Sequence, residues 1–406
     1  MINNLRLITG LAATAISISA LILHPTADAQ STPECVGTRL SSSSAVQEPT
    51  VTERVLRFRQ AWQLTTGLGV KVAVIDTGVA PNMRLGEVLD GGDLVDDTSA
   101  LVDCDGHGTL VAGIIAGLPG PDGFAGLAPD AQLLSIRQTS GKEGNLETLA
   151  HAIDTAVDEG ARVINISLTS CSPAEAMPKG ALEVTEAVAR AEAAGAVIVA
   201  AAGNTGEHCQ AGSVAWPAVL PEVLAVSAMQ FDEVGAVIPA DYAMTGKWVD
   251  VSAPGGPVLG PDPRTPQGLI DRHVVGSGET ARAQQIAGTS FATPAVSGTA
   301  ALLLSRHPEL SPAQVRELIV SSASPISSEL GLGRGVVAPY DALMWTTVDT
   351  VAQSHVDAAP APAPTPAVSS RGQRAPLRAT GLLVMCALLL GGWLLLRLGR
   401  STGQRP

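Results

Sequence analysis

Short apolar runs rich in valine and isoleucine alternate with longer, alanine-rich stretches through the middle of the chain. The runs predict buried β-strands, and the main ones are VKVAVID, AQLLSIRQT, RVINISL, AVIVAAAGN and LAVSAM. Between them, LETLAHAIDTAVDEG and ALEVTEAVARAEAAG carry apolar residues at helical spacing. This alternation is typical of parallel βαβ units, so we expect an α/β domain with a doubly wound, mostly parallel sheet flanked by helices.

The start of the chain has the pattern of a secretory signal peptide. A weakly basic beginning leads into the apolar stretch LAATAISISALIL, and Ala27 and Ala29 form an A-x-A-like cleavage site. We therefore predict a signal peptide over residues 1–29, with an uncleaved signal anchor as the alternative. An N-terminal arm follows over residues 30–59, and apolar positions in VTERVLRFRQAWQLTTG predict a helix that Gly67 ends.

The composition changes after the main folded domain, which we place at residues 60–347. An Ala/Pro-rich linker is predicted over residues 348–379 and the apolar run TGLLVMCALLLGGWLLL over residues 380–396 predicts a transmembrane helix. A cytoplasmic tail over residues 397–406 would follow. Arginines flank the apolar run on both sides, so the orientation rests on the signal peptide, which places the folded domain outside the cytoplasm.

Composition excludes some functions. The net charge is −13 and only 3% of the residues are aromatic, whereas nucleic-acid binding needs clustered Lys and Arg and stacking side chains. We therefore expect no nucleic-acid partner. Apolar residues make up 46% of the chain, which is enough for a large core.

Three polar side chains stand at predicted element boundaries. Asp76 ends the strand VKVAVID, and His107, between two glycines in DGHGTLVAG, opens an apolar helix. Ser290 in GTSFATP begins another long apolar helix, and Pro294 is expected to be tolerated there as part of the first turn. In a parallel sheet the carboxyl ends of the strands are where sites are built.

These three residue types suit acyl transfer. A serine hydroxyl becomes a good nucleophile when a neighbouring imidazole takes its proton, and the imidazole can then protonate the leaving amine. A buried carboxylate fixes the imidazole tautomer and stabilises the imidazolium. Each segment alone is more often a cap or a helix start, but together they predict a catalytic triad of Asp76, His107 and Ser290.

The segments VAVIDTGV, DGHGTLVAG and GTSFATP resemble the Asp, His and Ser boxes of the subtilase family, in that family's chain order. The resemblance implies a subtilisin-like fold and a serine endopeptidase. In it Asp76 orients the base, His107 is the general base and acid, and Ser290 attacks the peptide. VIVAAAGNTG resembles the oxyanion-hole box, which assigns that role to Asn204. Without the other boxes, a turn residue would be the better interpretation of Asn204.

Four further features narrow the resemblance: the unbroken segment DGHGTLVAGIIAGLPGPDGFAGLAPDAQLLSIRQTS, the run VIDTGVAP, the N-terminal arm with its cysteine, and the predicted C-terminal membrane helix behind a Pro-rich linker. Together they most resemble the mycosin type of subtilase, which is associated with type VII secretion. The resemblance implies a peptidase domain held at the outer face of the cell membrane by the single C-terminal span, beside a secretion membrane complex. It also implies that the N-terminal arm wraps the catalytic domain, since the arm is too short for a folded inhibitory pro-domain. We expect no cofactor and no metal site, and no calcium loop can be assigned.

Five cysteines occur, and four of them, Cys35, Cys104, Cys171 and Cys209, lie in the part predicted to be exported. Cys171 and Cys209 follow two sequential parallel strands, so both should emerge at one sheet edge and pair. Cys35–Cys104 then follows by elimination, although four cysteines allow three pairings.

The leading hypothesis is therefore a membrane-anchored serine endopeptidase that hydrolyses protein or peptide substrates. The alternative is a structural scaffold of a secretion complex, with secondary or vestigial proteolysis. We expect His151, His208, His273 and His307 to be surface residues without a role in the site.

Overall fold

The computed structural model describes residues 39–42, 49–140, 144–206, 209–210, 212–275 and 282–345. The predicted signal peptide, linker, transmembrane helix and tail, over residues 1–29 and 348–406, lie outside these ranges. Within them, no helix is both long and apolar enough to span a membrane.

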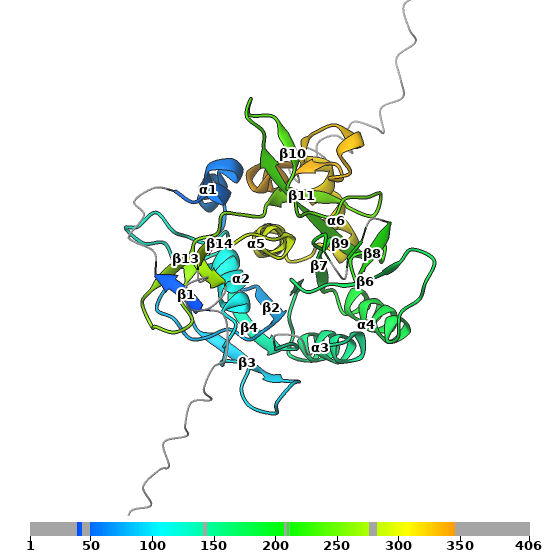
Figure 1. Cartoon of the computed structure of the whole chain (residues 1–406), viewed down its shortest axis with the longest axis horizontal. Coiled ribbons are helices and arrows are strands. Elements are labelled where there is room, and N and C mark those ends of the chain that lie inside the picture. Colours follow the sequence, from blue (N-terminus) through cyan, green and yellow to red (C-terminus); the bar gives the residue numbers. More distant parts are fainter. Residues whose placement is uncertain are drawn as a thin grey trace, which may run out of the picture. The chain divides into compact units, whose positions relative to one another are not determined.

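A central sheet dominates the described part of the chain (Figure 1). Its hydrogen-bonded strand order is β3-β4-β2-β5-β7-β9-β11, all parallel, continued by β16 and β15. The strands are β2 (Lys71–Asp76), β3 (Val88–Asp93), β4 (Gln132–Arg137), β5 (Val163–Ile166), β7 (Val197–Ala201), β9 (Val223–Phe231), β11 (Val251–Pro254), β15 (Ser324–Pro325) and β16 (Gly335–Val336). Every strand predicted from the apolar runs is present, and the subtilisin-like α/β fold is confirmed.

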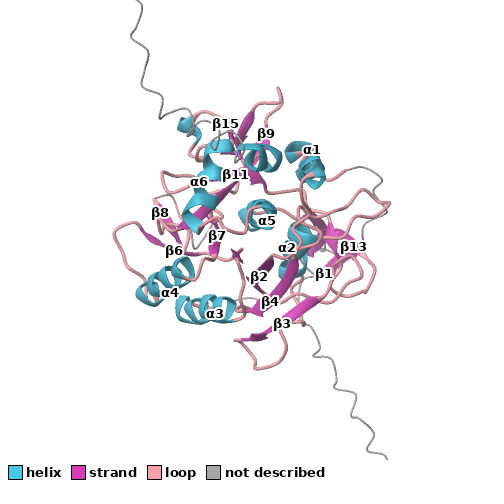
Figure 2. Ribbon diagram, turned by 180° about the vertical axis from the view of Figure 1, so that it is seen from behind, coloured by secondary structure: helices cyan, strands magenta, loops and turns pink. Residues whose placement is uncertain are grey.

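Helices cover both faces of this sheet (Figure 2). One face carries α3 (Leu146–Asp158) and α4 (Ala181–Ala193), which pack side by side. The other carries α2 (His107–Ala116), α5 (Thr289–Arg306) and α6 (Pro312–Ser322). Side chains alternate between the two cores along each strand: Val72 and Val74 join the α5 side, whereas Ala73 and Ile75 join the α3 side. The central strands are apolar at successive positions because both faces are buried.

Smaller strands surround the core. Strand β13 (Leu269–Val275) pairs antiparallel with β1 (Arg39–Ser42), β12 (Gly260–Pro261) and β14 (Arg282–Gln285). Strands β6 (Ser170–Pro173) and β8 (Ser213–Trp216) form a separate pair, and β10 (Val237–Pro239) pairs with β9. The sequence analysis missed these strands because most have only two to four residues, so no continuous apolar run marks them.

The segment predicted as one helix before Gly67 is divided. Helix α1 (Val51–Leu56) ends at Arg57, which adopts the left-handed conformation with φ 49°, and the 3-10 helix η1 (Phe58–Gln63) follows. Leu56 and Phe58 are buried, so this part of the predicted arm packs on the core.

The expectation for Pro294 was also wrong. Helix α5 begins at Thr289, so Pro294 lies beyond the first turn, where an N–H would ordinarily donate to the carbonyl of Ser290. The short 3-10 helix η3 (Ser328–Leu330) follows α6 later in the chain.

Candidate active site

The structure brings the three predicted catalytic side chains together at the carboxyl edge of the sheet. Nδ1 of His107 lies 2.6 Å from Oδ1 of Asp76, and Nε2 of His107 lies 2.9 Å from Oγ of Ser290. Asp76 is the last residue of β2, His107 is the first of α2 and Ser290 is the second of α5. Three segments far apart in sequence therefore form one hydrogen-bonded chain.

A close backbone approach makes this geometry possible. A Cβ atom on Gly108 would lie 2.1 Å from the carbonyl oxygen of Gly78, so only glycine lets the start of α2 approach the end of β2. Asp76 is fully buried, and its Oδ1 also accepts a hydrogen bond from the backbone N–H of Thr77 at 2.8 Å. The centre of the Phe291 ring lies 4.9 Å from that of the His107 ring. The imidazole thus contacts both a fixed carboxylate and an aromatic ring.

A second buried carboxylate, which the sequence analysis did not single out, supports the loop before His107. Asp103 accepts hydrogen bonds from the Thr77 hydroxyl at 2.9 Å, from Gly106 N at 2.7 Å, and from the N–H and hydroxyl of Thr109 at 2.9 and 2.6 Å. Burial raises the pKa of Asp103 to about 6, against the opposing effect of these hydrogen bonds. In the sequence, the only indication that Asp103 belongs to the site was its position four residues before His107.

The charges around His107 favour its protonated form. Burial alone lowers the pKa of the imidazole, but the attraction of Asp76, the hydrogen bond to it, and the charges of Asp103 and Asp105 together raise that pKa above its ordinary value. A base with a raised pKa is well suited to take the proton of a serine hydroxyl.

Asn204 lies beside Ser290, and hydrogen bonds from Thr289 fix the orientation of its side-chain amide. Its Oδ1 accepts hydrogen bonds from the backbone N–H and the hydroxyl of Thr289, both at 3.0 Å. A Cβ atom on Gly288 would lie 3.0 Å from Oγ of Ser290 and 3.3 Å from Nδ2 of Asn204, so these two groups border the same small space. Because Oδ1 is occupied by Thr289, Nδ2 is the part of the amide left to donate into this space.

A cleft of about 540 Å³ opens over these residues and is lined by His107, Ser290, Asn204, Thr169 and His273, among others. His273 lies on β13 and was expected to be a surface residue outside the site. His151 is exposed on α3, as expected, and His208 lies outside the described residues. His307 is partly exposed, with Nδ1 3.4 Å from Glu309.

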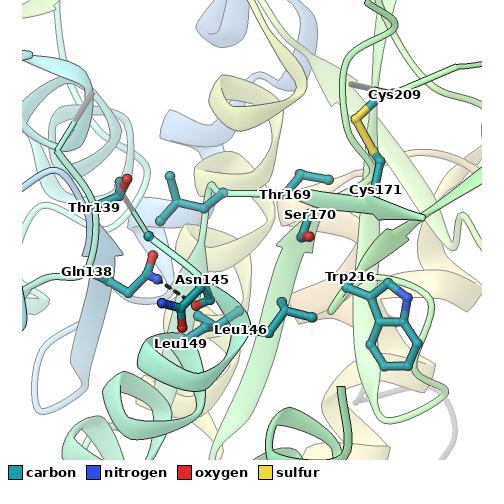
Figure 3. A pocket seen from close by; sticks show the side chains of 12 residues that line it. Gln138, Thr139, Asn145, Leu146, Leu149, Thr169, Ser170, Cys171, Cys209 and Trp216 are labelled. Carbon is teal, nitrogen blue, oxygen red and sulfur yellow. Dashed lines mark hydrogen bonds between the residues drawn. A yellow bond between two sulfur atoms is a disulfide. The ribbon is translucent and has the colours of Figure 1, made fainter. Parts of the chain in front are cut away.

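A larger cavity of about 910 Å³ adjoins the cleft and shares with it Thr139, Leu168, Thr169 and Cys209 (Figure 3). The disulfide and Trp216 lie on one side of it, whereas Gln138 and Asn145 lie on the other. Gln138 Nε2 donates to the carbonyl oxygen of Asn145 at 3.0 Å, which closes the base of the loop between β4 and α3.

Cys171 and Cys209 form a disulfide bond, the pairing expected from strand order. The bond ties the segment that follows Asn204 to strand β6. Cys104 is also disulfide-bonded, but Cys35 lies outside the described residues, so the Cys35–Cys104 pairing stays a prediction. The described ranges contain no group of three or more His, Cys, Asp or Glu side chains that could hold a metal ion.

Comparison with known proteins agrees with this geometry. A family model described as the Subtilase family matches residues 67–359. Mycosin-4 of Mycobacterium tuberculosis is 41% identical over 341 residues, which cover 77% of this chain and 73% of the relative.

Solved structures are similar as well. The structure of MycP3 protease from the type VII (ESX-3) secretion system is 38% identical with a TM-score of 0.67, over 76% of this chain and 91% of that one. A chain of an intact ESX-5 inner membrane complex is 32% identical with a TM-score of 0.69, over 90% of this chain and 93% of that one. The chain therefore belongs to the subtilase family of serine proteases, and within that family to the mycosin type.

Proposed function

We propose that Asp76, His107 and Ser290 hydrolyse peptide bonds by acyl transfer. The observation that carries the proposal is the pair of hydrogen-bond contacts of His107, 2.6 Å to Asp76 and 2.9 Å to Ser290. In the resting tautomer Nδ1–H donates to Asp76, and Nε2 accepts from the Ser290 hydroxyl. The base is thus aligned on the nucleophile before the substrate binds.

The reaction proceeds in two stages. Oγ of Ser290 attacks the scissile carbonyl carbon while Nε2 of His107 takes its proton, and the imidazolium that forms is stabilised by Asp76. The tetrahedral intermediate collapses when His107 returns the proton to the leaving amine, which leaves an acyl ester on Ser290. A water molecule, deprotonated by His107, then releases the acid and regenerates the hydroxyl.

The negative charge that develops on the oxygen of the tetrahedral intermediate must be stabilised by hydrogen-bond donors. Nδ2 of Asn204 borders the space above Ser290, and the backbone N–H of Ser290 lies at the start of α5, where helix N–H groups have no partner within the helix. Two such donors form an oxyanion hole that binds the charged intermediate more tightly than the neutral substrate.

The adjoining cavity is the natural place for the substrate side chains before the scissile bond. It continues from the cleft over Thr169 and Cys209, and both polar side chains and apolar ones such as Leu149 and Trp216 line it. A peptide that occupies it would cross the cleft with its carbonyl beside Ser290.

The proposal also includes where in the cell the protein acts. Relatives with similar structures come from type VII secretion systems, including an intact ESX-5 inner membrane complex. With the predicted signal peptide and the predicted single span over residues 380–396, this supports a membrane-anchored, extracytoplasmic protease that acts in type VII secretion as part of a membrane complex.

Labelling with a fluorophosphonate probe tests the chemistry. The unmodified protein should be labelled, and Ser290→Ala should abolish labelling without changing the melting temperature by more than a few degrees, since the change removes only a side-chain hydroxyl. Ser305→Ala, which removes a hydroxyl at the far end of α5, is the matched control and should label normally. Labelling of Ser290→Ala at the normal rate would refute the assignment.

A structural role in the secretion complex is the second candidate, and the relative found within an intact ESX-5 membrane complex favours it. The two functions separate in a deletion strain. If Ser290→Ala restores secretion while the probe no longer labels the protein, then the folded domain supports secretion without proteolysis. If it restores none although the protein is present at normal abundance, proteolysis is required.

A further inference from the structure

A polar side chain lies in the core beneath the nucleophile. Asn165 on β5 is 0% exposed, and the alternation along this strand turns it with Val163 toward α5, while Ile164 and Ile166 face α3 and α4. Burying an amide is costly unless hydrogen bonds replace those lost to water. The hydrogen bonds that Asn165 makes inside the core are therefore needed to offset this cost.

Three hydrogen bonds connect Asn165 with the backbone of the nucleophile. The hydroxyl of Ser297 donates to Oδ1 of Asn165 at 2.8 Å. Nδ2 of Asn165 donates to Oγ of Ser167 at 2.9 Å, and the Ser167 hydroxyl donates to the carbonyl oxygen of Ser290 at 2.8 Å. The chain of bonds leaves α5 at Ser297, crosses the end of β5 and returns to α5 at Ser290.

The carbonyl of Ser290 needs a donor from outside its helix. In an α-helix it would accept from the N–H four residues later, but that residue is Pro294, which has no N–H. The Ser167 hydroxyl takes its place. Because the amide of Asn165 already donates to Oγ of Ser167, the single proton of that hydroxyl is left for Ser290.

We propose that Ser167 and Asn165 are positioning residues for catalysis: they hold the backbone carbonyl of Ser290, and so fix the Cα position from which Oγ is directed at His107 and the backbone N–H at the developing oxyanion. The proposal rests on the proposed role of Ser290. Ser167 also lines the cleft, but its hydroxyl and the amide of Asn165 act through the backbone of Ser290. Pro294 makes the arrangement necessary, since it removes the donor that would otherwise fix this carbonyl.

The expected effect falls on the chemical step. A displacement of about 1 Å at a reacting group can cost about 10² in rate. Ser167→Ala should therefore lower kcat by about 10- to 100-fold, with a much smaller effect on KM, because the hydroxyl that is removed donates to the backbone carbonyl of Ser290. The rate constant for fluorophosphonate labelling should fall by a similar factor.

Two further variants separate positioning from packing and stability. Ser167→Cys keeps nearly the same side-chain volume but replaces the hydroxyl with a thiol, which is a weak donor, so its kcat should also fall. This variant tests the proposal even if Ser167→Ala does not fold. Ser252→Ala is the matched control: Ser252 is likewise buried, on strand β11 of the same sheet, and its hydroxyl also donates to a backbone carbonyl, that of Gly335 at 3.1 Å. This control should lose stability to a similar extent and keep normal kcat and labelling.

The proposal is overturned if Ser167→Cys has a normal kcat and a normal labelling rate, or if Ser252→Ala loses as much activity as the Ser167 variants. It is supported if only the Ser167 variants lose kcat. Failure of the underlying chemistry is distinguishable, since in that case Ser290→Ala itself would still be labelled.

Discussion

Replacement of Asn204 tests the oxyanion hole directly. In the structure Oδ1 of Asn204 is held by the N–H and hydroxyl of Thr289, both at 3.0 Å, which leaves Nδ2 toward Ser290. Asn204→Leu removes the amide donor and keeps a similar volume. Asn204→Asp keeps an oxygen for Thr289 but places a second oxygen where the donor was, so it should be at least as harmful.

The magnitude follows from the loss of one donor. In subtilisin the loss of such a donor costs about 2.7–4 kcal/mol of transition-state stabilisation, or about 10²–10³ in kcat. Asn204 is exposed, so water can replace its bonds to Thr289 and the free energy of unfolding should change by less than about 1 kcal/mol. KM should stay within about threefold, because the oxyanion exists only after the attack.

Steady-state hydrolysis of a fluorogenic peptide, with active sites counted by fluorophosphonate titration, measures the two constants separately. Thermal unfolding of each variant serves as the stability control. A decrease in kcat of less than about fivefold for Asn204→Leu, or an effect confined to KM, would refute the assignment of Nδ2 as an oxyanion donor.

Two other predictions follow from the charges and the disulfide. Activity requires neutral His107, whose pKa is raised above 6.5, so kcat/KM should fall as the pH drops through that raised pKa. Asp103→Asn removes a negative charge that raises the pKa of His107, so the acid limb of the pH profile of kcat/KM should move to lower pH. A limb that stays in place or moves to higher pH would contradict this prediction. The double change Cys171→Ser and Cys209→Ser opens a loop with a sequence separation of 38 residues, which should cost about 4 kcal/mol in urea unfolding. A decrease in the free energy of unfolding of less than about 1 kcal/mol would show that removal of the disulfide gives the unfolded chain little additional conformational freedom.

The local pattern of the sequence was enough for the central strands and the catalytic residue types. Strands buried on both faces must be apolar at successive positions, so β2, β4, β5, β7 and β9 are visible without knowledge of their neighbours. The position of Asp76 at a strand end and of His107 at a helix start is likewise a local property, and the order of the strands brings both to one edge. The strands β1, β12 and β14 left no such signal: the partner of β1 is distant in sequence, β12 has only two residues, and β14 is polar and exposed.

The supporting groups around the triad depended on the tertiary structure. Asn165 sits in the strand RVINISL, and nothing in that segment shows that its amide meets Ser167 and Ser297. Likewise, Pro294 can be read from the sequence, but the carbonyl that it leaves without a donor, and the hydroxyl that replaces that donor, come from different elements.

The sequence by itself determined which side chains we propose for the chemistry, because a nucleophile, a base and an orienting carboxylate are properties of residue type and of local element boundaries. Only the tertiary structure decided how accurately they are held. Hydrogen bonds such as that from Ser167 to Ser290 join residues 123 positions apart, and their distances are set when α5 packs on the sheet. Local propensity does not contain that information, since it arises from contacts between elements that the chain folds together.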